Sequence, residues 1–145
     1  MVDAAVRYAD AHGLESLSMP KLAQQLGVGT MTLYGYVASK RDLLDRMVAR
    51  LFEEIRIPPA TTWQEQMRAY FAQFRVAAVK HPALPELLST DRIERTPVAE
   101  DLEGLLELMQ ESGVSPKDSL RRFEAALVFT RGCERREATG GYRPV

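Results

Sequence analysis

The sequence predicts an all-α protein in which a small three-helix N-terminal head, containing a helix-turn-helix, precedes a C-terminal helical bundle. Hydrophobic residues recur at helical spacing through nearly all of the 145 residues. Segments that alternate with a period of two, as strands do, are not found, and the glycines and prolines fall mostly between the helix-periodic segments. The length suits one domain or a small head joined to a helical body.

Four helices are expected in the first part of the chain. They span Val2 to His12, Met19 to Leu26, Thr30 to Val37 and Lys40 to Ile55. Gly13 and Gly27 end the first two. Ser18 and Ser39 are expected to cap the second and the fourth, because a serine oxygen accepts a hydrogen bond from an N–H group of the first turn. Pro20 lies in the first turn of the second helix, where no hydrogen bond is lost.

Four further helical segments are expected after the Pro58-Pro59 pair. They span about Thr62 to Val79, Ala83 to Leu88, Val98 to Glu111 and Pro116 to Arg131. Few apolar residues follow, and glycines and arginines are frequent, so a frayed tail is expected there. The predicted division is a head over residues 1–45, a helical body over 46–131 and a disordered tail over 132–145.

The composition of the chain limits the classes of function that it can have. The chain has 19 Lys and Arg against 20 Asp and Glu, and this balance excludes a uniformly basic DNA-coating protein. Any nucleic-acid function must therefore use a local patch. One cysteine, Cys133, and two histidines, His12 and His81, favour neither a disulfide framework nor a metal site, and no cofactor is expected. No signal peptide or membrane span is apparent, so we expect a cytoplasmic protein.

The segment 22–36 (LAQQLGVGTMTLYGY) has the spacing of a helix-turn-helix. A short helix, a glycine turn and a second short helix follow one another within it, and such a motif directs its second helix at the major groove of DNA. Val28 is expected inside the turn. The apolar positions predicted to form a small core are Leu22, Ala23, Leu26, Val28, Leu33 and Val37.

Charge supports this interpretation. No acidic residue lies between Ser16 and Arg41, and this segment carries a local charge of +3 from Lys21, Lys40 and Arg41. Phosphate groups are attracted to such a patch. The second helix would direct Thr30, Met31, Thr32 and Tyr34 at DNA, where methyl groups meet thymine and hydroxyls reach base edges or phosphates. The alternative is an ordinary corner of a helical bundle.

Residues 18–44 (SMPKLAQQLGVGTMTLYGYVASKRDLL) resemble the TetR family of bacterial transcriptional repressors. The LGV and TLY triplets, Lys40 and the pair Leu43-Leu44 all fall in the family's register. Residues 110–132 (QESGVSPKDSLRRFEAALVFTRG) look like the tetracycline-repressor type of C-terminal domain. Members of that type usually continue through one or two more helices, so this C-terminal domain appears shortened. A natural short form, a truncated product and omitted segments are all compatible with that.

The resemblance implies a homodimer whose two heads enter successive major grooves of a palindromic operator, with half-sites roughly 34 to 36 Å apart. It also implies release by a small apolar effector. Carried over by position, the base-facing residues are Thr30, Met31, Thr32, Gly35 and Tyr36, and the phosphate-facing residues are Ser18, Lys21, Tyr34 and Lys40. Family members often have serine at the position of Gly29, histidine at that of Tyr36 and a DNA-contacting side chain at that of Gly35. These differences leave the operator sequence open but not the mode of binding.

The aromatic stripe of the fifth helix suggests an effector pocket in the body. The residues expected to line it are Trp63, Gln66, Tyr70, Phe74, His81, Leu105, Met109 and Phe123. The same spacing also fits a plain hydrophobic core. Residues 87–97 lack the histidine that magnesium-tetracycline binding needs in the family, so tetracycline is not expected. The candidate dimer-interface residues are Leu120, Phe123, Leu127 and Val128, with packing inside the chain as the alternative.

Three functional hypotheses follow. The first is a ligand-responsive repressor in which the helix from Lys40 to Ile55 transmits effector binding to the head. The second is a helical small-molecule-binding module whose incomplete dimer interface has weakened or abolished DNA binding. The third, an enzyme, is disfavoured because no paired acid and base, nucleophile motif, P-loop or metal cluster is recognisable.

Overall fold

The computed structural model describes residues 1–56, 62–88 and 98–138, and the regular structure in these ranges is entirely helical. The α-helices are α1 (Val2–His12), α2 (Met19–Leu26), α3 (Thr30–Tyr34), α4 (Lys40–Phe52), α5 (Trp63–Lys80), α7 (Val98–Glu111) and α8 (Pro116–Ala138). Two short 3₁₀ helices are η1 (Leu14–Ser16) and η2 (Leu84–Leu87). The all-α prediction is confirmed. None of the described helices is long and apolar enough to cross a membrane.

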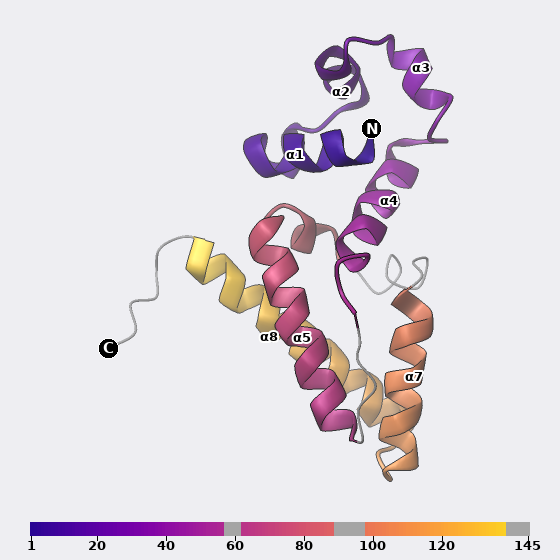
Figure 1. Ribbon diagram of the computed structural model, residues 1–145, viewed down its shortest axis with the longest axis vertical. Helices are drawn as coiled ribbons and strands as arrows, with labels where there is room; N and C mark the ends of the chain where they lie inside the picture. The colour runs from indigo at the N-terminus through magenta and orange to yellow at the C-terminus, as the bar shows by residue number, and fades with distance from the viewer. Residues whose placement is uncertain (57–61, 89–97, 139–145) are drawn as a thin grey trace.

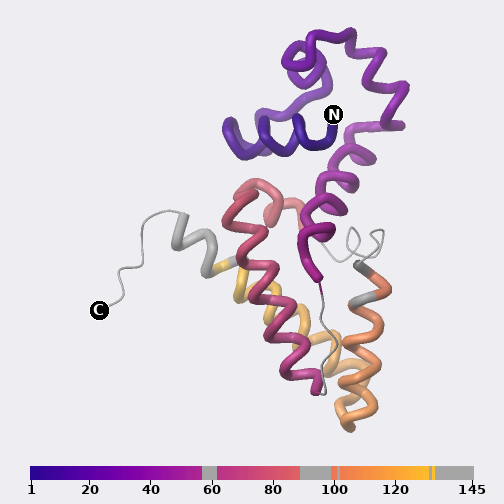
Figure 2. Tube along the Cα trace, in the orientation of Figure 1, coloured from indigo at the N-terminus to yellow at the C-terminus, as the bar shows by residue number. Residues whose placement is uncertain are grey.

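The helices are arranged as a head, a connecting helix and a body (Figure 1). The head consists of α1, α2 and α3, and α4 leads from it toward the body formed by α5, α7 and α8. The chain path in Figure 2 shows that α1 lies across the upper part of the body, next to the corner between α5 and η2. The head therefore meets the body through α1 as well as through α4.

The head helices begin where the sequence predicts. Ser18 Oγ accepts a hydrogen bond from the Lys21 N–H at 3.4 Å, and Ser39 Oγ accepts one from the Asp42 N–H at 3.1 Å. Each serine satisfies an N–H group that has no partner within its helix. The bounds of α1, α2 and α7 agree with the prediction.

Three helix ends differ from the prediction by three residues or more, whereas the bounds of α5 and η2 differ by one residue. The third helix ends at Tyr34 rather than Val37, because Gly35 and Tyr36 bond to carbonyls only three residues back. The fourth ends at Phe52 rather than Ile55, for the same reason. The eighth continues to Ala138, so residues 132–138, expected in a frayed tail, are helical. The sequence after Gly132 is rich in glutamate and arginine, which favour helix. The rest of that tail, 139–145, lies outside the described residues.

One continuous hydrophobic core joins head and body. In the head it is built on the alanine-rich face of α1, where small side chains let α2 and α4 pack closely. The middle of the core is formed by Met47, Val48 and Leu51 of α4, which are fully buried. It then continues into an aromatic cluster of the body around Tyr70 and Phe74. Head and body are therefore packed parts of one molecule, with α4 passing between them.

The segment after α4 is tied to α5 by one side chain. The Gln73 amide accepts a hydrogen bond from the Arg56 N–H at 2.7 Å and donates one to the Arg56 carbonyl. A side-chain amide that pairs with both backbone groups of one residue holds that residue as a neighbouring strand would. The segment that follows the connecting helix is therefore fixed against α5.

Replacement of Ser39 by alanine is expected to lower the free energy of unfolding by about 1 kcal/mol, because the Asp42 N–H loses its acceptor. Urea denaturation of the two proteins measures the difference. Ser39→Asp is the matched control, since a carboxylate caps a helix as well as a hydroxyl does. Equal losses for the alanine and aspartate variants would contradict the capping role.

Candidate nucleic-acid interface

The turn between α2 and α3 is set by backbone bonds around a glycine. Gly27 has φ 68° and ψ 28°, the left-handed conformation that glycine adopts at low cost. Its N–H donates to the Gln24 carbonyl at 3.2 Å, and the Val28 N–H donates to the Ala23 carbonyl at 3.0 Å. These two bonds form a Schellman motif, which ends α2 and redirects the chain into α3.

The third helix is held by one buried residue and presents the others to solvent. Leu33 is 2% exposed and packs into the core of the head, whereas Met31 is 80% exposed. Thr32, Tyr34 and Tyr36 are also exposed, and Thr30 is half-buried. Leu26, Val28, Met31, Tyr34 and Tyr36 are all exposed within 11 residues of sequence, and such a concentration of exposed apolar and aromatic side chains is typical of contact surfaces. The helix predicted to read DNA therefore lies on the surface of the head.

Two of the apolar residues expected inside the helix-turn-helix are not buried. Val28, predicted inside the turn, is 41% exposed, and Leu26 is similarly exposed. The prediction for these two residues is wrong because the Schellman bonds fix the angle between the helices without a side chain inside it. The other four predicted core residues are buried: Leu22, Ala23, Leu33 and Val37.

Three of the four residues predicted to hold phosphates lie at helix starts, and the fourth, Tyr34, ends α3. Ser18 caps α2, and Lys21 is exposed in the first turn of that helix. Tyr34 is exposed near the end of α3. At the start of α4, Lys40 extends across the head, and its Nζ donates to the Leu17 carbonyl at 2.7 Å. An ammonium group has three N–H donors, so one contact orients Lys40 and leaves donors for a further acceptor.

Asp42 is the first acidic residue after the positive segment, and its charge is compensated locally. Its carboxylate accepts from Arg46 Nε at 3.0 Å and from the Ala38 N–H at 2.9 Å. The hydrogen bond from Arg46, followed by that from Ala38, lowers the pKa of Asp42 below its usual value of 3.8. The carboxylate therefore stays ionised and paired beside the positive segment.

The lowered pKa of Asp42 predicts a pH dependence of stability. A carboxylate with a folded-state pKa below its unfolded value of 3.8 stabilises the fold above that pH, and the contribution is lost as pH falls through the folded-state pKa. We expect Asp42→Asn to be less stable than the unchanged protein at neutral pH, with a gap that narrows below about pH 4. Urea midpoints measured across that range test this, and a constant gap would contradict it.

The residues predicted to line an effector pocket do not all lie together. Five of them are buried in the body and pack closely, with the Tyr70 and Phe123 ring centroids 5.7 Å apart; the five are Tyr70, Phe74, Leu105, Met109 and Phe123. Trp63 and Gln66 are half-buried at the start of α5, where the Trp63 ring lies 5.5 Å from Arg122 Cζ. His81 caps the opposite end of α5 and contacts Asp10 of the head.

The residues predicted for a dimer interface divide into two groups on α8. Phe123 and Leu127 are buried within the chain, whereas Leu120 and Val128 are exposed. Phe129, which sequence reasoning missed, is 72% exposed. Its position next to Val128 in an apolar run was the available signal. The described part of α8 thus packs on the body through Phe123 and Leu127 and leaves the apolar side chains of Val128 and Phe129 uncovered.

The comparisons with known proteins agree with this geometry. Residues 1–47 match the family described as bacterial regulatory proteins, tetR family. The transcriptional repressor DrrR1 of Streptomyces coeruleorubidus is 34% identical over 118 residues, which cover 79% of this chain and 44% of that protein. The tetracycline repressor protein class D of Escherichia coli is 31% identical over 137 residues, covering 91% of this chain and 62% of that one. The chain thus spans about half the length of these relatives.

Solved structures extend the likeness beyond the head. The crystal structure of BioQ with its double-stranded DNA operator matches with a TM-score of 0.81 and 27% identity, over 94% of this chain and 85% of that one. BioQ of Mycobacterium smegmatis matches with a TM-score of 0.79 and 28% identity, over 94% and 83%. The fold and the exposed third helix together are those of a helix-turn-helix protein of the class of bacterial regulators. The chain belongs to the TetR family.

Proposed function

We propose that the protein is a ligand-responsive transcriptional regulator, which represses by binding a palindromic operator as a homodimer and is released by a small apolar effector. The observation that carries this proposal is the third helix, which is anchored by Leu33 and presents Met31 to solvent. The structural likeness to BioQ bound to its operator supports the same role for α3. The assembly would be cytoplasmic, where the DNA is.

In this proposal one group of head residues contacts the DNA bases, and another group contacts the phosphate backbone of the DNA. The base-facing residues are Thr30, Met31, Thr32, Gly35 and Tyr36, and the phosphate-facing residues are Ser18, Lys21, Tyr34 and Lys40. Phosphate contacts fix the register of a protein on the duplex, and base contacts select the sequence. The absence of acidic residues between Ser16 and Arg41 favours the approach of DNA to this face.

The dimer and effector parts of the proposal rest on the body. Exposed Val128 and Phe129, which are neighbours in the sequence, give α8 apolar side chains that a second copy would cover. The relatives named as repressors, among them a tetracycline repressor, support control by an effector. An effector that binds one arrangement of α4 better than another shifts the head between two states.

The test is selection of duplex DNA from a random pool by the whole chain, followed by binding measurements over a range of salt. We expect an enriched palindrome, a binding constant that falls steeply with salt, and a dimer mass by light scattering. A pool without an enriched sequence would contradict DNA recognition. A monomer that binds small apolar compounds but no DNA would instead support the binding-module alternative.

Lys40→Ala is expected to weaken binding to all sequences and to reduce the slope of log K against log salt by about 1 per head, because one phosphate contact is lost. Thr32→Ala should leave that slope unchanged and alter the preferred bases. Lys117→Ala removes an exposed positive charge on α8, in the body, and is the charge-matched control. A slope equally reduced in the Lys117 variant would contradict a local role for Lys40.

A further inference from the structure

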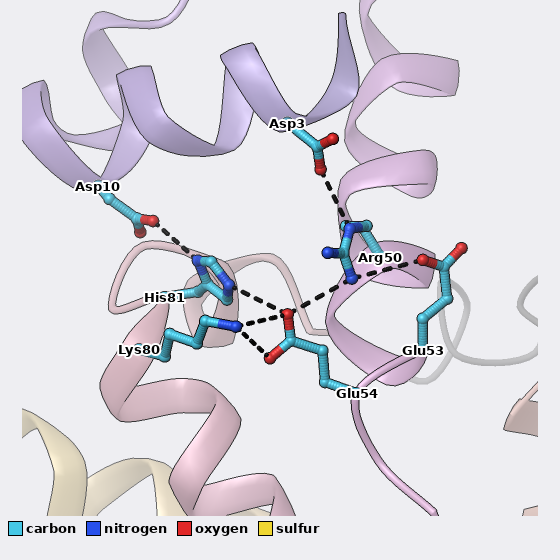
Figure 3. Close-up of polar contacts among 7 residues, drawn as sticks. All are labelled: Asp3, Asp10, Arg50, Glu53, Glu54, Lys80 and His81. Carbon is cyan, nitrogen blue, oxygen red and sulfur yellow. Dashed lines mark hydrogen bonds and ion pairs between the residues drawn. The ribbon is translucent and has the colours of Figure 1, made fainter.

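A cluster of charged side chains joins the head to the body (Figure 3). Its members come from α1, from α4 and the two residues after it, and from the end of α5, and they are Asp3, Asp10, Arg50, Glu53, Glu54, Lys80 and His81. Arg50 joins α4 to Asp3 of α1 at 3.0 Å, and Lys80 joins α5 to Glu54 at 3.0 Å. These contacts lead from head to body through α4. Asp10 is the member that joins α1 directly to the body.

Asp10 lies near the end of α1 and contacts two residues of the corner between α5 and η2. Its Oδ2 is 3.1 Å from His81 Nδ1, and its Oδ1 accepts a hydrogen bond from the Ala83 N–H at 3.0 Å. The Asp10 and His81 side chains are each only 19% exposed, and Ala83 is buried. In the described part of the chain, both hydrogen bonds between α1 and this corner involve Asp10.

The corner that Asp10 contacts is stiff. Pro82 lies between His81 and Ala83, and its ring fixes one backbone dihedral angle. The Leu84 N–H donates to the His81 carbonyl at 3.1 Å and closes a turn around Pro82. Hydrogen bonds are directional, so a carboxylate bonded on both sides of a fixed turn defines an orientation as well as a distance. The apolar packing around it is not directional and permits small rotations.

The helix α1 is attached at both of its ends, and the two attachments lead to different partners. Asp3, in the first turn, bonds to Arg50 of α4, whereas Asp10, in the last turn, bonds to the α5–η2 corner (Figure 3). The two aspartates are roughly 10 Å apart along the helix axis. A head attached only through α4 could turn about that helix. The bonds of Asp10 oppose this rotation because they reach the body without passing through α4.

We infer that Asp10 is a positioning residue for DNA binding, which fixes the angle between the head and the body. The helix α2 packs on α1, and α3 packs on α2, so the angle of α1 decides where α3 points. This inference rests on the proposed function, since two heads enter successive grooves together only when their angle suits the spacing of the half-sites. The sequence analysis assigns no role to Asp10.

The angle is tested without DNA by residual dipolar couplings of the whole chain. In the unaltered protein, one alignment tensor should fit the amides of α1, α2, α5 and α8. Asp10→Ala removes both bonds, and the head amides should then no longer fit the tensor of the body. Asp10→Asn should restore the common tensor, because an amide can accept from the Ala83 N–H and donate to a ring lone pair of His81. A common tensor with unchanged orientation in Asp10→Ala would overturn the inference.

Asp3→Ala is the matched control. It removes the same charge from the same helix and breaks a bond to α4 rather than to the body. We expect it to retain the common tensor, and an equal loss in this variant would overturn the special role of Asp10. If Asp10→Ala does not fold, Asp10→Glu replaces it, since the longer side chain keeps the charge and displaces the carboxylate from the corner.

The functional consequence is tested on the selected operator and on the same operator with its half-sites moved apart by one base pair. We expect Asp10→Ala to reduce the preference for the original spacing about fivefold, while Asp10→Asn and Asp3→Ala retain it. Equal weakening on both duplexes is what a merely structural role predicts, and it would overturn the positioning role. If no DNA is selected at all, the proposed function fails, and the dipolar couplings still decide whether Asp10 fixes the head.

Discussion

Met31→Glu is expected to weaken operator binding about 100-fold or more while leaving the fold intact. The side chain is 80% exposed, so a carboxylate there stays solvated in the free protein and costs little stability. In the complex the same carboxylate would lie in the major groove among phosphates, and a like-charge contact at an interface costs several kcal/mol. Fluorescence anisotropy with the selected duplex measures the loss, and circular dichroism checks the helix content.

Gln64→Glu is the matched control for Met31→Glu. It adds the same negative charge at an exposed position in the first turn of α5, at the end of that helix farthest from the head (Figure 1). We expect its operator affinity to stay within about twofold, because charges beyond a Debye length of about 10 Å are largely screened. Unimpaired binding by Met31→Glu would show that α3 is not the helix that enters the groove.

Phe74→Ala is expected to lower the free energy of unfolding by about 3 to 5 kcal/mol. Phe74 is fully buried, and its ring centroid lies 6.5 Å from that of Tyr70 and 6.4 Å from that of Phe71. The substitution loses the transfer free energy of the ring and leaves a cavity that the surrounding helices close only in part. Urea denaturation followed by circular dichroism measures the change.

Val76→Ala is the control within the same helix. Val76 is 71% exposed in the single chain, and alanine is the better helix former, so we expect a change within about 0.5 kcal/mol. A Phe74→Ala variant as stable as this control would indicate that the ring occupies an effector-sized space rather than a packed core. That result would support the effector pocket that the sequence predicts around Phe74.

The head was predictable from sequence because its signals are local. Ser18 and Ser39 each lie just before a helix, and Gly27 ends one, so the positions of α2 and α4 could be inferred from short stretches. The exposure of α3 followed from the single apolar residue, Leu33, that its short helix turns inward. Val28 was misplaced because its hydrophobicity suggested burial, whereas backbone bonds alone fix the turn.

The contacts between head and body were not predictable from sequence. Asp10 and His81 are 71 residues apart, and no periodicity or motif links a carboxylate on α1 to a helix-capping histidine. The sequence places His81 among the polar residues of an effector pocket, yet the fold turns it toward the head. The buried aromatic residues were recognised as a group, but spacing alone does not distinguish a lined cavity from a packed core.

The Gln73 amide bound to Arg56 gives α4 a pivot at its lower end. With the chain just after this end tied to α5, a tilt of α4 produces its largest displacement at the opposite end, where Lys40 and the end of the positive segment lie. The helix has 13 residues and is roughly 20 Å long, so a tilt of about 5° moves its first residue by roughly 1.7 Å. Under the proposed function, small rearrangements near α5 would thereby change how far the head reaches toward DNA.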